Sequence, residues 1–217
     1  MRLLNLLEEH IDSLDGWISI INSYNSVNLD STTAPPNVEL TYKTTNVFIE
    51  ISQLFFSYGA FKDKFDNSLM SPHIYGFDVY IKSKKTETEI RFGIDDKGIY
   101  LETYLKHFSN LRHMGDDFYK DIFALMDLGE FSTPEYELFG SETTKKYPDI
   151  FKNQKSEIFN LLRTYIIGIV EGKNNIPSKH FRIYWSYSLD FHDILYNSCL
   201  AFKLLYNLNY SLWKATH

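Results

Sequence analysis

Only one cysteine, Cys199, occurs among the 217 residues of the chain, which excludes an internal disulfide. Its neighbours, YNSCLAFKLL, are mostly apolar, and a lone cysteine in an apolar helix is usually an inert core residue. The chain has no uncharged apolar run of about 18 residues, the length typical of a membrane-spanning helix. Near the N-terminus, Asn5, Glu8 and Glu9 interrupt the apolar letters before the core of a secretion signal can form. We therefore expect a soluble, cytoplasmic protein.

Short catalytic signatures are missing as well. The sequence contains no G-x-x-x-x-G-K-[ST] or G-x-G-x-x-G loop, no H-E-x-x-H, no G-x-S-x-G and no C-x-x-C. His10 and Asp12 are two residues apart, so they point to different sides of a helix. His192, in the letters DFHD, lies at an expected helix start, which is typical of a surface or capping residue. These absences favour a binding protein over an enzyme, and we expect no cofactor and no metal.

Charge is concentrated in one part of the chain. Lys and Arg number 22 against 28 Asp and Glu, which gives a formal net charge of −6. Residues 114–142 hold eight acidic side chains and a single base, Lys120, so this segment carries −7 and the remainder about +1. A nucleic-acid binder concentrates lysine and arginine instead. Direct binding to nucleic acid is therefore not expected.

The pattern of apolar residues predicts a single α+β domain spanning residues 1–217. The chain is 44% hydrophobic and 17% aromatic, enough for a substantial core. Strand-like alternation over residues 74–106 predicts an antiparallel meander, which a further strand at 180–188 extends to a sheet of three to four strands. About five or six helices pack with it. Helices are expected at 3–21, at 44–61 with an end near Gly59, and at 115–128, 133–140, 148–170 and 190–208.

Turns at Lys84–Lys85 and Asp96–Lys97 would divide the meander into three strands. If residue 83 pairs with 86, Asp78 lies opposite Arg91, and if residue 95 pairs with 98, Arg91 also lies opposite Glu102. These registers bring opposite charges together on one face of the sheet and apolar pairs together on the other, as cross-strand pairing favours.

The letters HMGDDFYKDIFALMDLGEF, residues 113–131, predict an amphipathic helix. On a helical wheel the apolar side chains fall within one arc and face the core: Phe118, Ile122, Leu125 and Met126. A metal site would need His113 stacked with Asp117 and Asp121. Gly115, however, indicates that the helix begins after His113, which would leave the histidine outside it.

The acidic residues of this region continue well past the helix. Acids at a helix start stabilise its dipole, but that effect decays within the first turn. A surface of one sign instead speeds association with a cationic partner. We therefore assign candidate partner-binding roles to Asp116, Asp117, Asp121, Asp127, Glu130, Glu135 and Glu137. The alternative is that these residues form an ordinary solvated surface.

A second candidate interface is the polar side of the meander. It carries Tyr80, Tyr100 and Tyr104 among glutamates, and tyrosine is well suited to interfaces because it buries area while keeping a polar tip. The alternative is that a helix covers this face.

Part of the meander resembles a nuclease motif. Asp78 followed by Glu89-Ile90-Arg91 is similar to the D…E-x-K arrangement of restriction-endonuclease-like nucleases, in which two carboxylates hold Mg²⁺ and a lysine assists the attacking water. Arginine stands here in place of that lysine and does not deprotonate. A metal-dependent nuclease or other hydrolase is thus the alternative function.

In general character, an acidic, aromatic-rich chain without catalytic motifs resembles the immunity proteins of bacterial polymorphic-toxin and contact-dependent-inhibition systems. The resemblance implies a protein that binds a cognate toxin, often a cationic nuclease, and blocks it. Our leading hypothesis is therefore a binding protein that neutralises a basic toxin domain through its acidic surface. An adaptor subunit of a larger assembly is the third possibility.

Overall fold

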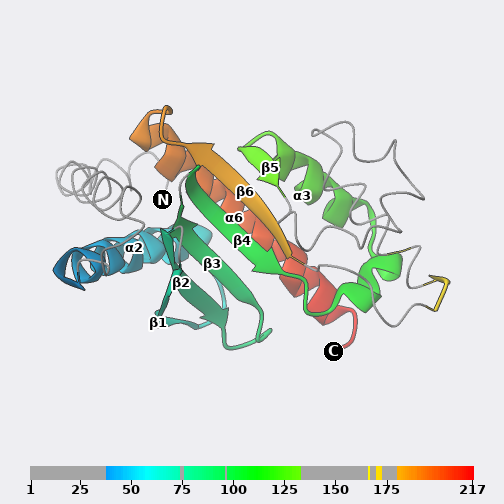
Figure 1. Ribbon diagram of the computed structural model, residues 1–217. Coiled ribbons are helices and arrows are strands. Elements are labelled where there is room, and N and C mark those ends of the chain that lie inside the picture. The colour runs from blue at the N-terminus through cyan, green and yellow to red at the C-terminus, as the bar shows by residue number, and fades with distance from the viewer. Residues whose placement is uncertain (1–37, 74–75, 96, 133–165, 167–169, 173–179) are drawn as a thin grey trace.

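The computed structural model describes residues 38–73, 76–95, 97–132, 166, 170–172 and 180–217. These residues form an antiparallel sheet with the strand order β1-β2-β3-β4-β6-β5, together with helices on one side of it (Figure 1). The protein is therefore α+β, as predicted. The strands are β1 (Phe65–His73), β2 (Gly76–Ser83), β3 (Glu89–Ile94), β4 (Gly98–Tyr104), β5 (Glu130–Ser132) and β6 (His180–Ser186).

The number of elements differs from the prediction. The sheet has six strands where three or four were expected, because β1 and the short β5 carry little apolar alternation. The described residues contain the α-helices α2 (Val38–Gly59), α3 (Asp116–Met126) and α6 (Phe191–Lys214) and one 3₁₀-helix, η1 (Phe108–His113). Five or six helices were expected, but the predictions for 3–21, 133–140 and nearly all of 148–170 lie outside the described residues.

Helix α2 ends where the sequence predicted. Its apolar residues recur at helical spacing and are buried along one side: Val47, Phe48, Ile51, Leu54 and Phe55. The helix finishes at Gly59, and Ala60 adopts a left-handed conformation with φ of 47°. Its backbone N–H donates to the carbonyl of Phe56 at 3.1 Å, which closes the last turn.

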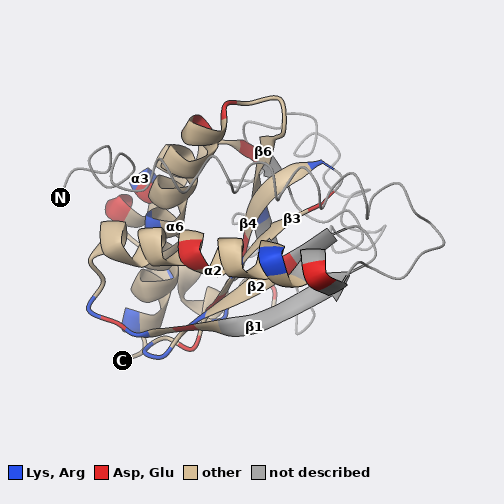
Figure 2. Cartoon of the chain, turned by 90° about the vertical axis from the view of Figure 1, so that its left-hand side faces the viewer, with Lys and Arg blue, Asp and Glu red and all other residues tan. Residues whose placement is uncertain are grey.

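The core lies between the sheet and the helices α2 and α6, which Figure 2 shows on the same side of the sheet. At its centre, the Phe92 ring of β3 lies 4.5 Å from the Phe48 ring and 5.0 Å from the Phe55 ring, centroid to centroid. Phe202 of α6 stacks on Phe55 at 5.0 Å. Aromatic pairs of this kind stabilise a core by about 0.5–1.5 kcal/mol each beyond the area that they bury.

One of the two predicted hairpin registers is confirmed. Strands β3 and β4 pair so that Arg91 lies opposite Glu102. Strands β2 and β3 are shifted by two residues from the prediction, and Asp78 lies opposite Gly93 instead of Arg91. Because side chains alternate with a period of two, the shift leaves each side chain on its predicted face.

The cause of the shift is the loop that connects these strands. The backbone N–H of Ser83 donates to the carbonyl of Thr88 at 3.0 Å, so four residues form the loop instead of the predicted two. The Ser83 hydroxyl accepts hydrogen bonds from the Thr86 N–H at 3.0 Å and the Thr86 hydroxyl at 2.9 Å. Glu87 completes the loop with a φ of 55°, a conformation that sequence patterns rarely reveal outside glycine and asparagine.

Helix α6 begins with a side-chain cap. The Asp190 carboxylate accepts a hydrogen bond from the backbone N–H of His192 at 2.8 Å, so His192 lies at a helix start as predicted. The buried side of α6 includes Cys199, Phe202 and Leu205, and the helix spans the length of the sheet (Figure 1). Within the ranges given above, no helix has the length and apolar character needed to cross a membrane.

Candidate functional site

Helix α3 presents the predicted acidic surface. It starts after Gly115 and turns Phe118, Ile122 and Leu125 into the core, as the helical wheel predicted. Met126 is partly buried against the same core. This buried side packs on α6, so the exposed side is held on a fixed element of the fold.

The acidic side chains of α3 lie on its outer side. Asp116, Asp117 and Asp127 are exposed and Asp121 is half-buried. Lys120 is the basic residue of α3, and its ammonium group lies 3.1 Å from the Asp117 carboxylate. Partial burial raises the pKa of Asp121, and the neighbouring charge of Asp117 raises it further. The Asp121 carboxylate thus experiences repulsion from Asp117 in the folded chain, although Lys120 pairs with Asp117.

An aromatic side chain interrupts the acidic surface. Phe123 is 55% exposed and lies on the same side of α3 as Asp116 and Asp127, because positions 116, 123 and 127 fall within a narrow arc of the helical wheel. Glu130, in β5, is also exposed. The predicted contacts Glu135 and Glu137 lie outside the described residues. The surface is therefore an acidic field with an apolar group inside it.

The structure places His113 before α3 and outside it, as predicted. His113 is the last residue of η1, and the chain is extended at Met114 before α3 begins. The part of the chain described by the structure contains no group of three His, Cys, Asp or Glu side chains arranged to hold a metal ion. Asp117 and Asp121 thus stand without a third ligand from these residues.

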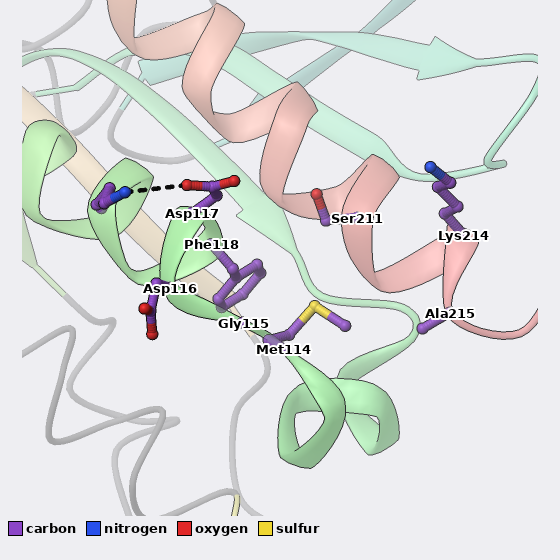
Figure 3. Close-up of a pocket in the computed structure, with 9 residues that line it drawn as sticks. Met114, Gly115, Asp116, Asp117, Phe118, Ser211, Lys214 and Ala215 are labelled. Atoms are coloured by element: carbon purple, nitrogen blue, oxygen red, sulfur yellow. Dashed lines mark hydrogen bonds and ion pairs between the residues drawn. The ribbon is translucent and has the colours of Figure 1, made fainter.

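A shallow cavity of about 620 Å³ lies where the start of α3 meets the end of α6 (Figure 3). Met114 and Phe118 supply apolar surface, while two acids of α3 and one lysine from each helix also line the cavity. The complete lining is Met114, Gly115, Asp116, Asp117, Phe118, Lys120, Ser211, Lys214 and Ala215. This charged lining differs from the predominantly apolar lining that is usual in small-molecule pockets.

The other face of the sheet contains a buried polar cluster, which begins at Tyr100. Its ring crosses over Gly93 on the neighbouring strand, and its hydroxyl donates a hydrogen bond to the Asp78 carboxylate at 3.1 Å. Tyr100 is completely buried and Asp78 is 3% exposed. Burial raises the pKa of Tyr100 well above its usual value, and the charge of Asp78 raises it further, so the phenol stays protonated.

Arg182 of β6 joins the remaining members of this cluster. Its guanidinium lies 2.7 Å from the Glu102 carboxylate and 3.0 Å from the Asp95 carboxylate, and 3.8 Å from the centre of the Tyr100 ring. The hydroxyl of Tyr184 donates a hydrogen bond to Asp95. Burial opposes the charged form of Arg182, but Glu102 and the neighbouring tyrosines outweigh it, and the guanidinium pKa is raised. The positive charge is therefore secure at any physiological pH.

These contacts correct the predicted tyrosine interface. Tyr100 is buried, because the missing side chain at Gly93 lets its ring lie flat on the sheet, so it is not available to a partner. Tyr80 is half-buried, with the Arg91 guanidinium 4.9 Å from its ring centre. The side chain of Tyr104 lies outside what the structure describes. In this part of the chain, the acidic surface of α3 is the more accessible of the two candidate surfaces.

Sequence reasoning missed Arg182, Tyr184 and Asp95. Alternation in HFRIYWS indicates that Arg182 and Tyr184 lie on one face of a strand, so this part could be predicted. The pairing of Arg182 with Glu102 across β6 and β4 could not be predicted, because the two residues are far apart in sequence.

The register of β2 and β3 separates the carboxylates of the nuclease-like motif. Asp78 lies opposite Gly93, four residues along β3 from Glu89. At about 3.4 Å per residue in an antiparallel strand, the two positions are about 14 Å apart along the strand direction, too far for both side chains to ligate one magnesium ion at about 2.1 Å.

The chain was also compared with known proteins. No family model, no curated protein and no solved structure matches it.

Proposed function

We propose that this protein is a non-catalytic binding protein that captures a basic partner on the outer side of α3, and that it acts in the cytoplasm as an immunity protein against a cognate bacterial toxin. The observation that carries the proposal is the exposed side of α3, which carries Asp116, Asp117 and Asp127 together with the 55%-exposed ring of Phe123.

Rigidity supports a docking role for this helix. The opposite side of α3 is fixed by Phe118, Ile122 and Leu125, which are at most 5% exposed. A surface held on a packed helix loses little conformational entropy when a partner binds. An acidic surface that is already ordered can thus meet a basic toxin domain without rearrangement.

The electrostatics favour a cationic partner. Partial burial and the charge of Asp117 raise the pKa of Asp121, and a lysine or arginine from a partner would offset the repulsion between these two carboxylates. Acidic fields of this kind mainly raise association rates, and the gain falls as salt screens it. Phe123 adds apolar surface that a partner can bury, and a buried aromatic side chain at an interface mainly slows dissociation.

The test is association with the toxin domain encoded by the neighbouring gene, measured by stopped-flow at several ionic strengths. Asp117→Lys with Asp121→Lys is expected to lower the association rate at least about tenfold at low salt and to flatten its dependence on salt. The matched control is Glu50→Lys with Asp193→Lys, which changes the net charge equally at exposed positions elsewhere.

The results of this experiment distinguish toxin neutralisation through the acidic surface from the adaptor function. An association rate and salt dependence that are the same in the α3 variant and in the control would refute the role of the acidic surface. A stable complex that leaves the toxin active would instead support the adaptor function.

A further inference from the structure

Two loops lie at the end of the sheet nearest the C-terminal end of α6 (Figure 2), and hydrogen bonds join them. One loop precedes β1, and the other connects β2 with β3. The backbone N–H of Lys84 donates to the carbonyl of Lys64 at 2.9 Å. One oxygen of the Asp63 carboxylate accepts from the backbone N–H of Lys64 at 2.6 Å and of Lys85 at 3.2 Å. The loops are thus held against each other.

The second carboxylate oxygen of Asp63 is also occupied. It accepts a hydrogen bond from the Ser83 hydroxyl and one from the Tyr206 hydroxyl at 3.1 Å. Since Tyr206 belongs to α6, a single carboxylate connects two loops and a helix. Both oxygens of Asp63 are consumed within the fold, so this acid serves as a structural connector.

The joined loops carry four exposed lysines, Lys62, Lys64, Lys84 and Lys85, which we call the lysine platform. In the part of the chain that the structure describes, none of their ammonium groups lies within 4.0 Å of a carboxylate. The ammonium group of Lys85 lies 4.9 Å from the centre of the Tyr210 ring and 5.6 Å from that of Trp213. These contacts fix its position without neutralising its charge.

The nearby acids cancel part of this charge. Glu87, on the same hairpin loop, is paired with Lys106 at 2.6 Å, whereas Asp63 contributes one formal negative charge, because its hydrogen-bond partners are neutral backbone N–H and hydroxyl groups. Asp66 is exposed at the start of β1 and opposes the lysines in part. A local excess of positive charge therefore stands on a chain whose formal net charge is −6.

We propose that the lysine platform binds an acidic segment of a partner protein, at a surface different from that of α3. A short run of aspartate or glutamate interacts with charges within about 10 Å, the Debye length at 0.1 M salt, and so senses mainly the platform. A long polyanion or an anionic membrane also senses the negative remainder of the molecule and is repelled by it.

The aromatic rings beside the platform argue against single-stranded nucleic acid. Such ligands stack their bases on free ring faces. Here Tyr210 stacks with Tyr206 at 6.0 Å and contacts Trp213 at 5.6 Å, centroid to centroid, and Lys85 lies over the same two rings. The rings are engaged with one another, which leaves the lysines as the recognition groups.

The experiment is fluorescence anisotropy with a labelled octaglutamate peptide at 50 and 200 mM salt. We expect the intact protein to bind, with an affinity that falls as salt rises, and Lys62→Glu with Lys84→Glu to weaken binding at least about tenfold. The matched control, Lys43→Glu with Lys97→Glu, alters the net charge equally at exposed lysines elsewhere and is expected to stay within about twofold.

Three results would overturn the proposal: no binding of octaglutamate at 50 mM salt, an equal loss of affinity in the platform variant and the control, or tighter binding of a single-stranded oligothymidylate of equal charge. None of these results depends on the toxin used to test α3, so the two proposals fail independently. Circular dichroism of both double variants checks that they fold.

Discussion

Replacing Gly93 with alanine tests the buried polar cluster directly. Gly93 lies on β3 beneath the Tyr100 ring, and a methyl group added there would lie 2.6 Å from the ring carbon and hydroxyl of Tyr100 and 2.7 Å from the Asp78 side chain. Real side-chain contacts are not that short, and the neighbouring strands leave the backbone little room to shift. The Tyr100 ring must therefore move, and its hydrogen bond to Asp78 must break.

The expected loss of stability has two parts. Overpacking a rigid site destabilises by about 1–3 kcal/mol, and the loss of a hydrogen bond to a charged group adds about 1.5–3 kcal/mol. A total of about 4 kcal/mol is a large share of the ~5–15 kcal/mol that stabilises a typical domain. For a chain of this length, it corresponds to a fall in Tm of about 8–16 °C, measurable by calorimetry and by urea titration.

A double-mutant cycle separates the clash from other effects of the substitution. In a Tyr100→Ala background, Gly93→Ala is expected to cost less than about 1 kcal/mol, because the ring it meets is gone. Gly115→Ala is the control, since an added methyl group there meets nothing within 4 Å. If Gly93→Ala shifts the Tm by less than about 2 °C, or costs the same in both backgrounds, the Tyr100 ring does not lie as described.

Three further predictions concern other buried or crowded groups. Asp121→Asn is expected to raise the Tm at pH 7 and to leave it unchanged near pH 2. The folded-state pKa of Asp121 is raised, so the folded chain loses stability as pH rises above the ordinary aspartate pKa and the carboxyl becomes charged. An equal gain in Tm at both pH values would contradict this. Arg182→Met leaves Glu102 and Asp95 without their main counter-ion and is expected to destabilise by about 3–5 kcal/mol in urea titration, whereas a loss under about 1 kcal/mol would show that the cluster is not buried. Burial raises the pKa of the Cys199 thiol to about 12, so it is expected to react with a disulfide reagent only on the timescale of unfolding, and rapid labelling of the native protein at pH 8 would refute its burial.

Local patterns in the sequence predicted the local elements well. The C-terminal end of α2, the start of α3, the start of α6 at Asp190 and the β3–β4 register follow from apolar spacing and from turn residues close in sequence. The start of α2 at Val38 and the end of α6 at Lys214 lie outside the predicted ranges 44–61 and 190–208. The β2–β3 register did not follow, because it depends on hydroxyl hydrogen bonds in a four-residue loop and on the left-handed backbone of Glu87. Such a conformation has no periodic signal.

The candidate site likewise has a part that local sequence predicts and a part that it does not. The outward side of α3 could be predicted because one helix contains all of its residues. The buried cluster could not, since it forms only when β6 lies beside β4 and places Arg182 opposite Glu102. Gly93 is the feature that a sequence reading could have used, because a glycine inside a strand often marks a close approach by another group.

The position of β6 also sets an order of events during synthesis. Residues 98–104 pair with residues 180–186, so β4 stays an open strand edge until about 80 further residues have been made. At ~5–20 residues per second, that delay lasts roughly 4–16 s. Through this interval the edge of β4 lacks its partner strand β6, and its apolar face lacks α6. A strand with an unpaired edge and an exposed apolar face is prone to pair with other chains. Solubility of the newly made protein should therefore depend on chaperones more than its folded stability suggests.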